Sequence, residues 1–111
     1  MKKKTLIWIT TLFTAYHRWE EAPESVSFLR SFHRHLFEVE IGMSVTHNDR
    51  DIEFFTFKSE VDEYIEQVYV GKRFSKSCEM IAEDLLDHFQ ASYVCVSEDG
   101  ENGARVDREE D

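Results

Sequence analysis

Three histidines, His17, His33 and His35, carry the clearest chemical signal in the sequence. His33 and His35 are two residues apart, so on a β-strand both imidazoles project to one face, about 6.6 Å apart along the chain. This spacing suits two ligands of a tetrahedral zinc ion, and a third imidazole would leave the fourth position open for water or a substrate. A core histidine bonded to a backbone carbonyl is the commoner explanation, and the spacing alone leaves both interpretations open.

Two segments of alternating hydrophobicity would position these histidines. Residues 33–45 alternate with period two and predict a strand. Its apolar positions have the same parity as the two histidines and are Phe37, Val39, Ile41, Met43 and Val45. Residues 6–16 are rich in Ile, Trp, Thr and Phe and predict another strand, whose odd-numbered side continues at His17. We therefore expect all three imidazoles on the inner face of one sheet.

Two later segments predict amphipathic helices. Residues 57–68 and 78–89 both repeat apolar side chains at steps of three and four. Ser77 precedes the second segment and is a good N-cap residue. Residues 23–32 favour a short helix or a compact loop, with Pro23 where a first helical turn tolerates it.

The C-terminal part of the chain predicts two further strands, at residues 92–97 and 104–106, with Gly100 and Gly103 marking the turn between them. The complete order is β-β-α-α-β-β. Such an order predicts an α+β fold, in which four antiparallel strands carry two helices on one face.

Length and composition indicate one folded domain. The 111 residues have room for a single core, and we assign residues 1–106 to one domain and residues 107–111 to an acidic tail. Hydrophobic residues make up 41% of the chain, which is enough for a packed globule. The formal charge of −10 repels phosphate backbones and anionic headgroups, which argues against nucleic acid as a general partner.

The cysteines and the N-terminal segment indicate a cytoplasmic protein. Cys78 and Cys95 have the spacing of neither a disulfide framework nor a CxxC metal site, which fits a reducing compartment. Thr10 and Thr11 interrupt the first apolar run, and no small-residue cleavage site follows it. We therefore expect neither a signal peptide nor a membrane span.

The arrangement of the histidines resembles the metal-ligand pattern of the 6-pyruvoyltetrahydropterin synthase family, which includes the 6-carboxytetrahydropterin synthases of deazaguanine biosynthesis. Thr14-Ala15-Tyr16-His17 followed by His33-Arg34-His35 is similar to the early histidine and later HGH of that family. Three further segments resemble family landmarks in the same order: residues 51–58 resemble Asp-Phe-x-x-Leu-Lys, residues 77–82 resemble Thr-x-Glu-Asn-Leu-Ala, and residues 94–98 resemble a strand that ends in glutamate.

The resemblance implies a β2-α2-β2 tunnelling fold with zinc (Zn2+) held by His17, His33 and His35. It also implies that Glu98 anchors the ring of a pterin or purine-like ligand, with Glu79 as a second pocket glutamate. In this family the sheet edges pair between subunits, so a homo-oligomer, either a trimer or a hexamer, is expected. From the residues alone, Glu98 could equally be a turn residue in an acidic loop.

The departures from the family pattern concern catalysis. Leu29 stands where the family has its catalytic cysteine, four residues before the first histidine of HGH, and the usual Asp-His pair has no counterpart because residues 61–76 contain no histidine. The standard activity is therefore expected to be weak or absent. Cys78, Glu79 and His47 are the nearest candidates for a replacement base.

Each replacement candidate has a simpler alternative, and two functions remain open. Cys78 heads the apolar stripe of its helix and would then be a buried structural thiol, and His47 lies in a polar turn where exposed histidines are common. The first function is a zinc-dependent, lyase-like enzyme acting on a pterin or related purine-derived ligand. The second is a catalytically silent relative that binds such a ligand or a protein partner.

Overall fold

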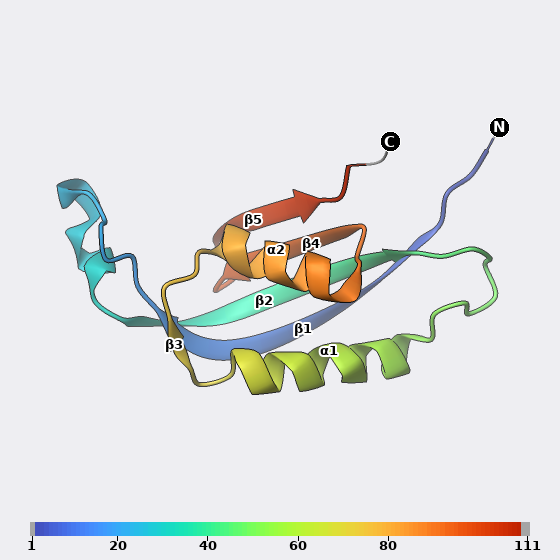
Figure 1. Cartoon of the computed structure of the whole chain (residues 1–111), viewed down its shortest axis with the longest axis horizontal. Coiled ribbons are helices and arrows are strands. Elements are labelled where there is room, and N and C mark those ends of the chain that lie inside the picture. Colours follow the sequence, from blue (N-terminus) through green and yellow to red (C-terminus); the bar gives the residue numbers. More distant parts are fainter. Residues whose placement is uncertain (1, 110–111) are drawn as a thin grey trace.

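The structure is a computed structural model that describes residues 2–109 (Figure 1). Within that range the elements are β1 (Leu6–His17), the 3-10 helix η1 (Glu24–Arg30), β2 (His33–Ser44), α1 (Phe54–Val68), β3 (Arg73–Phe74), α2 (Cys78–Phe89), β4 (Tyr93–Glu98) and β5 (Asn102–Asp107). The predicted α+β class is confirmed. β5 includes Asp107, the first residue assigned to the acidic tail, whereas Glu110 and Asp111 lie outside the described residues.

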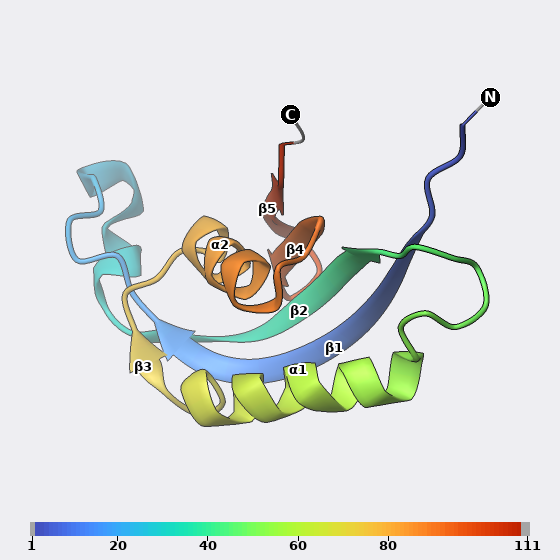
Figure 2. The same cartoon turned by 45° about the vertical axis from the view of Figure 1, so that its right-hand side comes forward.

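The strands form one curled sheet in the order β3-β1-β2-β4-β5 (Figure 2). β1 and β2 are antiparallel along their whole length, with Leu6 opposite Ser44 and His17 opposite His33. The prediction of four antiparallel strands is wrong in one respect, because β3 is a fifth strand that runs parallel to β1. β3 has only two residues, which are too few to produce an alternating pattern in the sequence.

Both helices pack on the same face of this sheet. Odd-numbered side chains of β1 and β2 share one core cluster with the apolar sides of α1 and α2. The members of this cluster include Ile9, Phe13, Phe37, Val39 and Ile41 from the sheet, Phe57, Val61 and Ile65 from α1, and Ile81, Ala82 and Leu85 from α2. Each large side chain that is fully removed from water contributes about 1.5–3 kcal/mol to folding. The core therefore fixes which sides of β1 and β2 face the helices.

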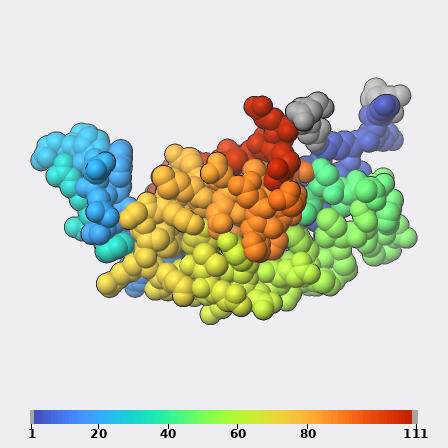
Figure 3. All heavy atoms as spheres, in the orientation of Figure 1, coloured from blue at the N-terminus to red at the C-terminus, as the bar shows by residue number. Residues whose placement is uncertain are grey.

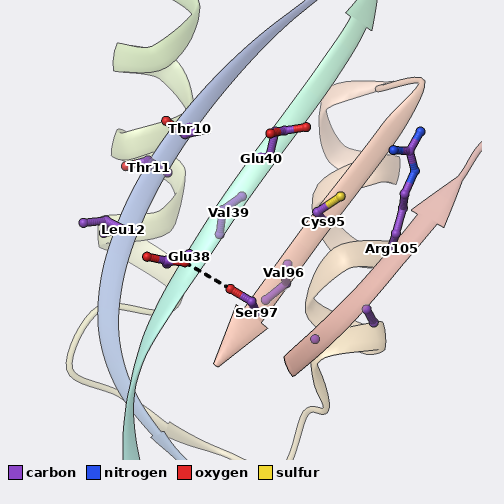
Figure 4. Close-up of a pocket in the computed structure, with 12 residues that line it drawn as sticks. Thr10, Thr11, Leu12, Glu38, Val39, Glu40, Cys95, Val96, Ser97 and Arg105 are labelled. Carbon is purple, nitrogen blue, oxygen red and sulfur yellow. Dashed lines mark hydrogen bonds between the residues drawn. The ribbon is translucent and has the colours of Figure 1, made fainter. Parts of the chain in front are cut away.

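The other face of the sheet is open to solvent in the described part of the chain. Figure 4 looks onto this face, with both helices behind the strands. Glu38 and Glu40 of β2 lie on it, near Ser97 and Arg105 of the next two strands. Leu12 of β1 also belongs to this face and is 58% exposed. One buried and one solvated face explain the alternation seen in the sequence.

α2 begins and ends where its sequence predicts. The hydroxyl of Ser77 accepts a hydrogen bond from the backbone N–H of Met80 at 3.2 Å, which is an N-cap contact. Glu79 lies in the first turn, where the helix dipole favours a negative charge. Gln90 ends the helix in the left-handed conformation, with φ of 55°. Neither α2 nor any other helix within residues 2–109 is long and apolar enough to cross a membrane.

Replacing Ser77 by alanine is expected to lower the free energy of unfolding by about 1 kcal/mol, because the N–H of Met80 loses its acceptor. Urea unfolding followed by circular dichroism measures this change. Ser75→Ala is the matched control, since the Ser75 hydroxyl makes only an exposed contact of 3.5 Å with Glu20. Equal stability of Ser77→Ala and wild type would contradict a capping role.

The two longest connecting segments lie at opposite ends of the described part of the molecule. The segment 18–32, which contains η1 and confirms the predicted short helix, projects from one end, and the loop 45–53 lies at the other (Figure 3). In the β4–β5 turn, Asp99 and Gly100 have φ values of 55° and 71°. Gly103, predicted in this turn, lies inside β5 instead, where a Cβ atom would clash with the backbone of the neighbouring strand.

Candidate metal centre

The register of β1 and β2 brings the three histidines together. His17 is directly opposite His33, and Ala15 is opposite His35, so His17 and His35 are diagonal neighbours. The ring centroids are 4.6 Å apart for His17 and His33, 5.2 Å for His17 and His35, and 5.0 Å for the two rings of β2. All three side chains have the parity of the helix-covered face. The cluster therefore lies where that face reaches the projecting segment 18–32.

Glu98 joins the histidines from β4. This residue ends β4 opposite Phe37 of β2. Its Oε2 atom is 2.7 Å from Nε2 of His17 and 3.4 Å from Nε2 of His35. Its Oε1 atom accepts a hydrogen bond of 3.1 Å from Nδ2 of Asn102. One carboxylate oxygen thus points at the imidazoles while the other is held by β5.

The Nδ1 atom of each histidine ring also has an oxygen partner. Nδ1 of His17 is 2.9 Å from the carbonyl oxygen of Lys76, and Nδ1 of His33 is 2.9 Å from that of Ser31. Nδ1 of His35 is 2.7 Å from Oδ2 of Asp99. Carbonyl and carboxylate oxygens only accept hydrogen bonds, so each of these three contacts is a hydrogen bond in the tautomer whose hydrogen is on Nδ1. With Nδ1 held in this way, Nε2 of His17 and Nε2 of His35 both face Oε2 of Glu98, as the free nitrogen does in histidines that bind metal ions.

The inner atoms form a donor set that fits a metal ion. One donor atom from each of His17, His33, His35 and Glu98 lies within 4.8 Å of the other three. Ligands about 2.0–2.1 Å from a tetrahedral ion are separated from one another by about 3.3 Å. Oε2 of Glu98 lies 3.4 Å from Nε2 of His35, which matches this separation. The same oxygen lies 2.7 Å from Nε2 of His17, which is the length of a direct hydrogen bond. The cluster could therefore hold a metal ion.

A cavity of about 540 Å³ borders this cluster. Its walls include His17, His33 and Glu98 on one side, and it is further lined by Arg18, Trp19, Leu29, Lys76, Cys78, Glu79 and Met80. Glu79 is exposed in it. The hollow of about 590 Å³ on the open face of the sheet, drawn in Figure 4, contains none of the histidines. A small molecule bound near the cluster would therefore occupy the 540 Å³ cavity.

Cys78 lies at this cavity as a buried thiol. Its side chain belongs to the hydrophobic core, and only 7% of the residue is exposed. Burial raises the pKa of the thiol to about 12, and the negative charges of Glu98 and Glu79 act in the same direction. The start of α2, which would favour a thiolate, does not offset the burial. Cys78 is therefore protonated at neutral pH.

His47 is not brought to the cluster. This residue follows β2, whose other end carries the histidine pair, and it borders a separate cavity in the loop 45–53. Its Nε2 atom is 3.5 Å from Oδ1 of Asp51. Within this chain the length of β2 separates His47, predicted as a replacement base, from the other site residues. Cys95 is also remote, since it lies on the open face of the sheet (Figure 4).

The chain is similar in fold to a solved structure. A crystal structure of uncharacterized protein WS1659 from Wolinella succinogenes matches 97% of this chain and 100% of its own chain, with a TM-score of 0.81 and 14% sequence identity. The chain matches no protein-family model and no curated protein. At this level of identity the match concerns the fold alone.

Two acidic residues at the histidines have contacts that the sequence does not predict. The sequence places Glu98 at a ligand ring, whereas its carboxylate contacts the imidazoles, and the parity of Val94 and Val96 marks its face as the helix-covered one. The sequence indicates no role for Asp99. Its contact with His35 depends on the left-handed turn after β4, which has no recognisable signal apart from the Asp99-Gly100 dipeptide.

Proposed function

We propose that the protein binds one zinc ion through His17, His33 and His35 and acts on a pterin or related purine-like ligand. In this proposal it is a divergent relative of the 6-pyruvoyltetrahydropterin synthases with their tunnelling fold. One observation carries the metal part: one donor atom from each of the three imidazoles and one from Glu98 lie within 4.8 Å of one another, while Nδ1 of each ring has an oxygen partner. The four landmarks in the sequence support the ligand class.

The donor set is of the kind that zinc takes, and it suits neither magnesium nor calcium. Magnesium and calcium prefer oxygen ligands, whereas three imidazoles and one carboxylate suit a borderline ion with tetrahedral coordination. A zinc ion at this place would supply a Lewis acid for an oxygen atom of the bound ligand, which would enter as a fifth ligand or in place of Glu98. We assign Glu98 to the metal as a fourth ligand, because its Oε2 atom already points at two of the imidazoles.

The second carboxylate, Glu79, is then the better candidate for ring recognition. It is exposed at the 540 Å³ cavity, whose volume falls within the range of about 300–1,000 Å³ typical of small-molecule sites. A carboxylate can accept two N–H donors from the edge of a guanine-like or pterin-like ring. Trp19 lines the same cavity and is 52% exposed, so its indole offers a flat surface for stacking.

The open edges of the sheet support a homo-oligomer as part of this proposal. β3 covers β1 only at Tyr16 and His17, and β5 lies at the opposite edge of the described sheet. Natural proteins usually pair or cover such edges. We propose that they pair between subunits in a trimer or a hexamer.

A catalytically silent binding protein is the second candidate function. It is favoured by two of the candidate replacement bases and by the residue that stands at the position of the family's catalytic cysteine. Cys78 holds its proton at neutral pH, His47 lies at the far end of β2, and Leu29 presents an apolar side chain to the cavity. Of the three candidate bases, which are Cys78, Glu79 and His47, only Glu79 both lies near the cluster and can accept a proton.

Elemental analysis of protein purified without chelators tests the metal part of the proposal. We expect about one zinc ion per chain in wild type, as for a single tetrahedral site. His47→Ala is the matched control, because it removes an imidazole outside the cluster and should retain the full zinc content. Protein that still lacks zinc after dialysis against an equimolar zinc salt would refute the proposal.

The same preparations test the ligand class. Thermal unfolding in the presence of pterins, deazapurines or purine nucleotides should show a rise in Tm for the class that binds, since a ligand of the folded state stabilises it. Glu79→Gln should reduce that rise while leaving zinc content unchanged. No shift with any pterin or purine would remove this ligand class from the proposal.

A further inference from the structure

The three histidines differ in what holds their outer nitrogen. Backbone carbonyls hold His17 and His33, whereas a side chain, the carboxylate of Asp99, holds His35. Backbone acceptors are present whatever the local side chain is. A carboxylate 64 positions along the chain is a feature of this particular sequence, and it is the one outer contact that a substitution can remove.

Asp99 is itself fixed firmly to β2. Its backbone N–H donates to the carbonyl oxygen of Leu36 at 2.8 Å, and its Oδ1 atom accepts from the N–H of Leu36 at 2.9 Å. Its φ of 55° and the φ of 71° at Gly100 form the tight turn that aims the carboxylate back toward β2. One carboxylate therefore joins the β4–β5 turn to the backbone of Leu36 and to the ring of His35.

The alternative is that Asp99 only stabilises the turn. The bond to the N–H of Leu36 would be sufficient for that role and uses a single oxygen. The second oxygen lies 2.7 Å from Nδ1 of His35, on the side of the ring opposite the inward Nε2 atom. A contact in that position determines which nitrogen carries the hydrogen and how the ring is rotated.

We propose that Asp99 is a positioning residue of the metal centre, which keeps the hydrogen of neutral His35 on Nδ1 and directs Nε2 toward Glu98 and the other imidazoles. This inference rests on the proposed zinc site. Partners of this kind typically change metal affinity about 10- to 100-fold when they are removed. Through its contacts with Leu36 and His35, Asp99 also links the β4–β5 turn to the part of β2 that carries the histidine pair.

Asp99→Asn separates the two roles. Asparagine adopts the left-handed conformation readily, so the turn is retained. Its amide has one oxygen and one NH₂ group, whereas the carboxylate accepts from two donors, the N–H of Leu36 and Nδ1 of His35. One of these donors must therefore lose its partner. Glu101→Gln is the matched control, because it removes one negative charge from the same turn without touching His35.

Zinc affinity, measured by competition with a fluorescent chelator, is the first readout. We expect the Kd of Asp99→Asn to rise about 10- to 100-fold and that of Glu101→Gln to stay within about twofold of wild type. In a His35→Ala background, Asp99→Asn should no longer change the Kd, since the contact is already absent. An unchanged Kd in Asp99→Asn, or an equal rise in both variants, would overturn the proposal.

The ring of His35 in metal-free protein is the second readout. Nitrogen-15 NMR about two pH units above the ordinary histidine pKa of about 6.5 reports which nitrogen of the neutral ring carries the hydrogen. We expect Nδ1–H for His35 in wild type, a mixture of both forms in Asp99→Asn, and no change at His33. An unchanged His35 in the variant would overturn the proposal. Because this measurement contains no zinc, its result is independent of whether the metal proposal holds.

Discussion

Replacing His35 by alanine is expected to weaken zinc binding about 10²-fold. Binding free energies of structural zinc sites are about 10–16 kcal/mol for four ligands, so one ligand contributes about 3 kcal/mol, which corresponds to two orders of magnitude. His35 is a clean position for this test, because its side chain is 22% exposed. His17 is a poorer choice, since it is only 8% exposed and its removal would leave Glu98 without its closest partner.

The comparison with His33→Ala and Glu98→Gln shows which side chains belong to the donor set. His33→Ala should lose a similar amount of affinity. Glu98→Gln keeps the size of the side chain but removes its charge, and as a fourth ligand it should lose at least about tenfold in affinity. His47→Ala and His88→Ala remove imidazoles outside the cluster and should bind zinc like wild type. Chelator competition measures the five variants and wild type.

Two outcomes would contradict this assignment. Equal zinc affinity in His35→Ala, His33→Ala and wild type would show that these imidazoles are core side chains and that zinc, if present, binds elsewhere. A loss in both histidine variants with unchanged affinity in Glu98→Gln would remove Glu98 from the donor set. In that case Glu98 would return to the role that the sequence resemblance implies, as the anchor of a ligand ring.

Parity explains why the position of the histidines could be predicted from the sequence. A strand sends alternate side chains to opposite faces, so the apolar residues of 33–45 and of 6–16 also determine where His33, His35 and His17 point. The structure agrees, because Phe37 and Phe13 are buried on the same face as these rings. Strands that alternate over many residues make this inference secure, since a shift by one residue would expose the whole core.

The pairing of strands could not be predicted in the same way. Parity determines the face of a side chain, but the neighbour across the sheet depends on register and on the turns. His17 is opposite His33, and Glu98 is opposite Phe37, because β1, β2 and β4 align at this end of the sheet. Glu98 thereby lies beside the imidazoles of His17 and His35, at the border of the 540 Å³ cavity.

Cys78 illustrates a competition that the sequence leaves undecided. Its position at the start of a helix favours the thiolate, whereas its place at the head of an apolar stripe favours burial. In the structure the thiol lies in the core, and burial raises its pKa to about 12. The apolar stripe of α2 was recognisable, and the deciding factor was how closely that stripe packs on the sheet.

We expect the protein to convert dihydroneopterin triphosphate much more slowly than the family does. This applies to both family products, 6-pyruvoyltetrahydropterin and 6-carboxytetrahydropterin. The family reaction needs one base from a cysteine and another from an Asp-His pair, and this chain has Leu29 and no histidine within 61–76 in those places. Loss of one positioned acid or base costs about 10²–10⁴ in rate, so the absence of both should reduce turnover by at least about 10⁴.

A product assay at high enzyme concentration with zinc-loaded protein tests this expectation, and Cys78→Ala and Glu79→Gln identify the source of any remaining activity. Cys78→Ala should change little, because the thiol packs in the hydrophobic core, where burial raises its pKa. Glu79→Gln should abolish slow turnover if Glu79 is the replacement base, since an amide cannot accept the proton. Rapid turnover that Cys78→Ala abolishes would contradict both the expected rate and the protonated thiol, and would make Cys78 the relocated base of an ordinary family enzyme.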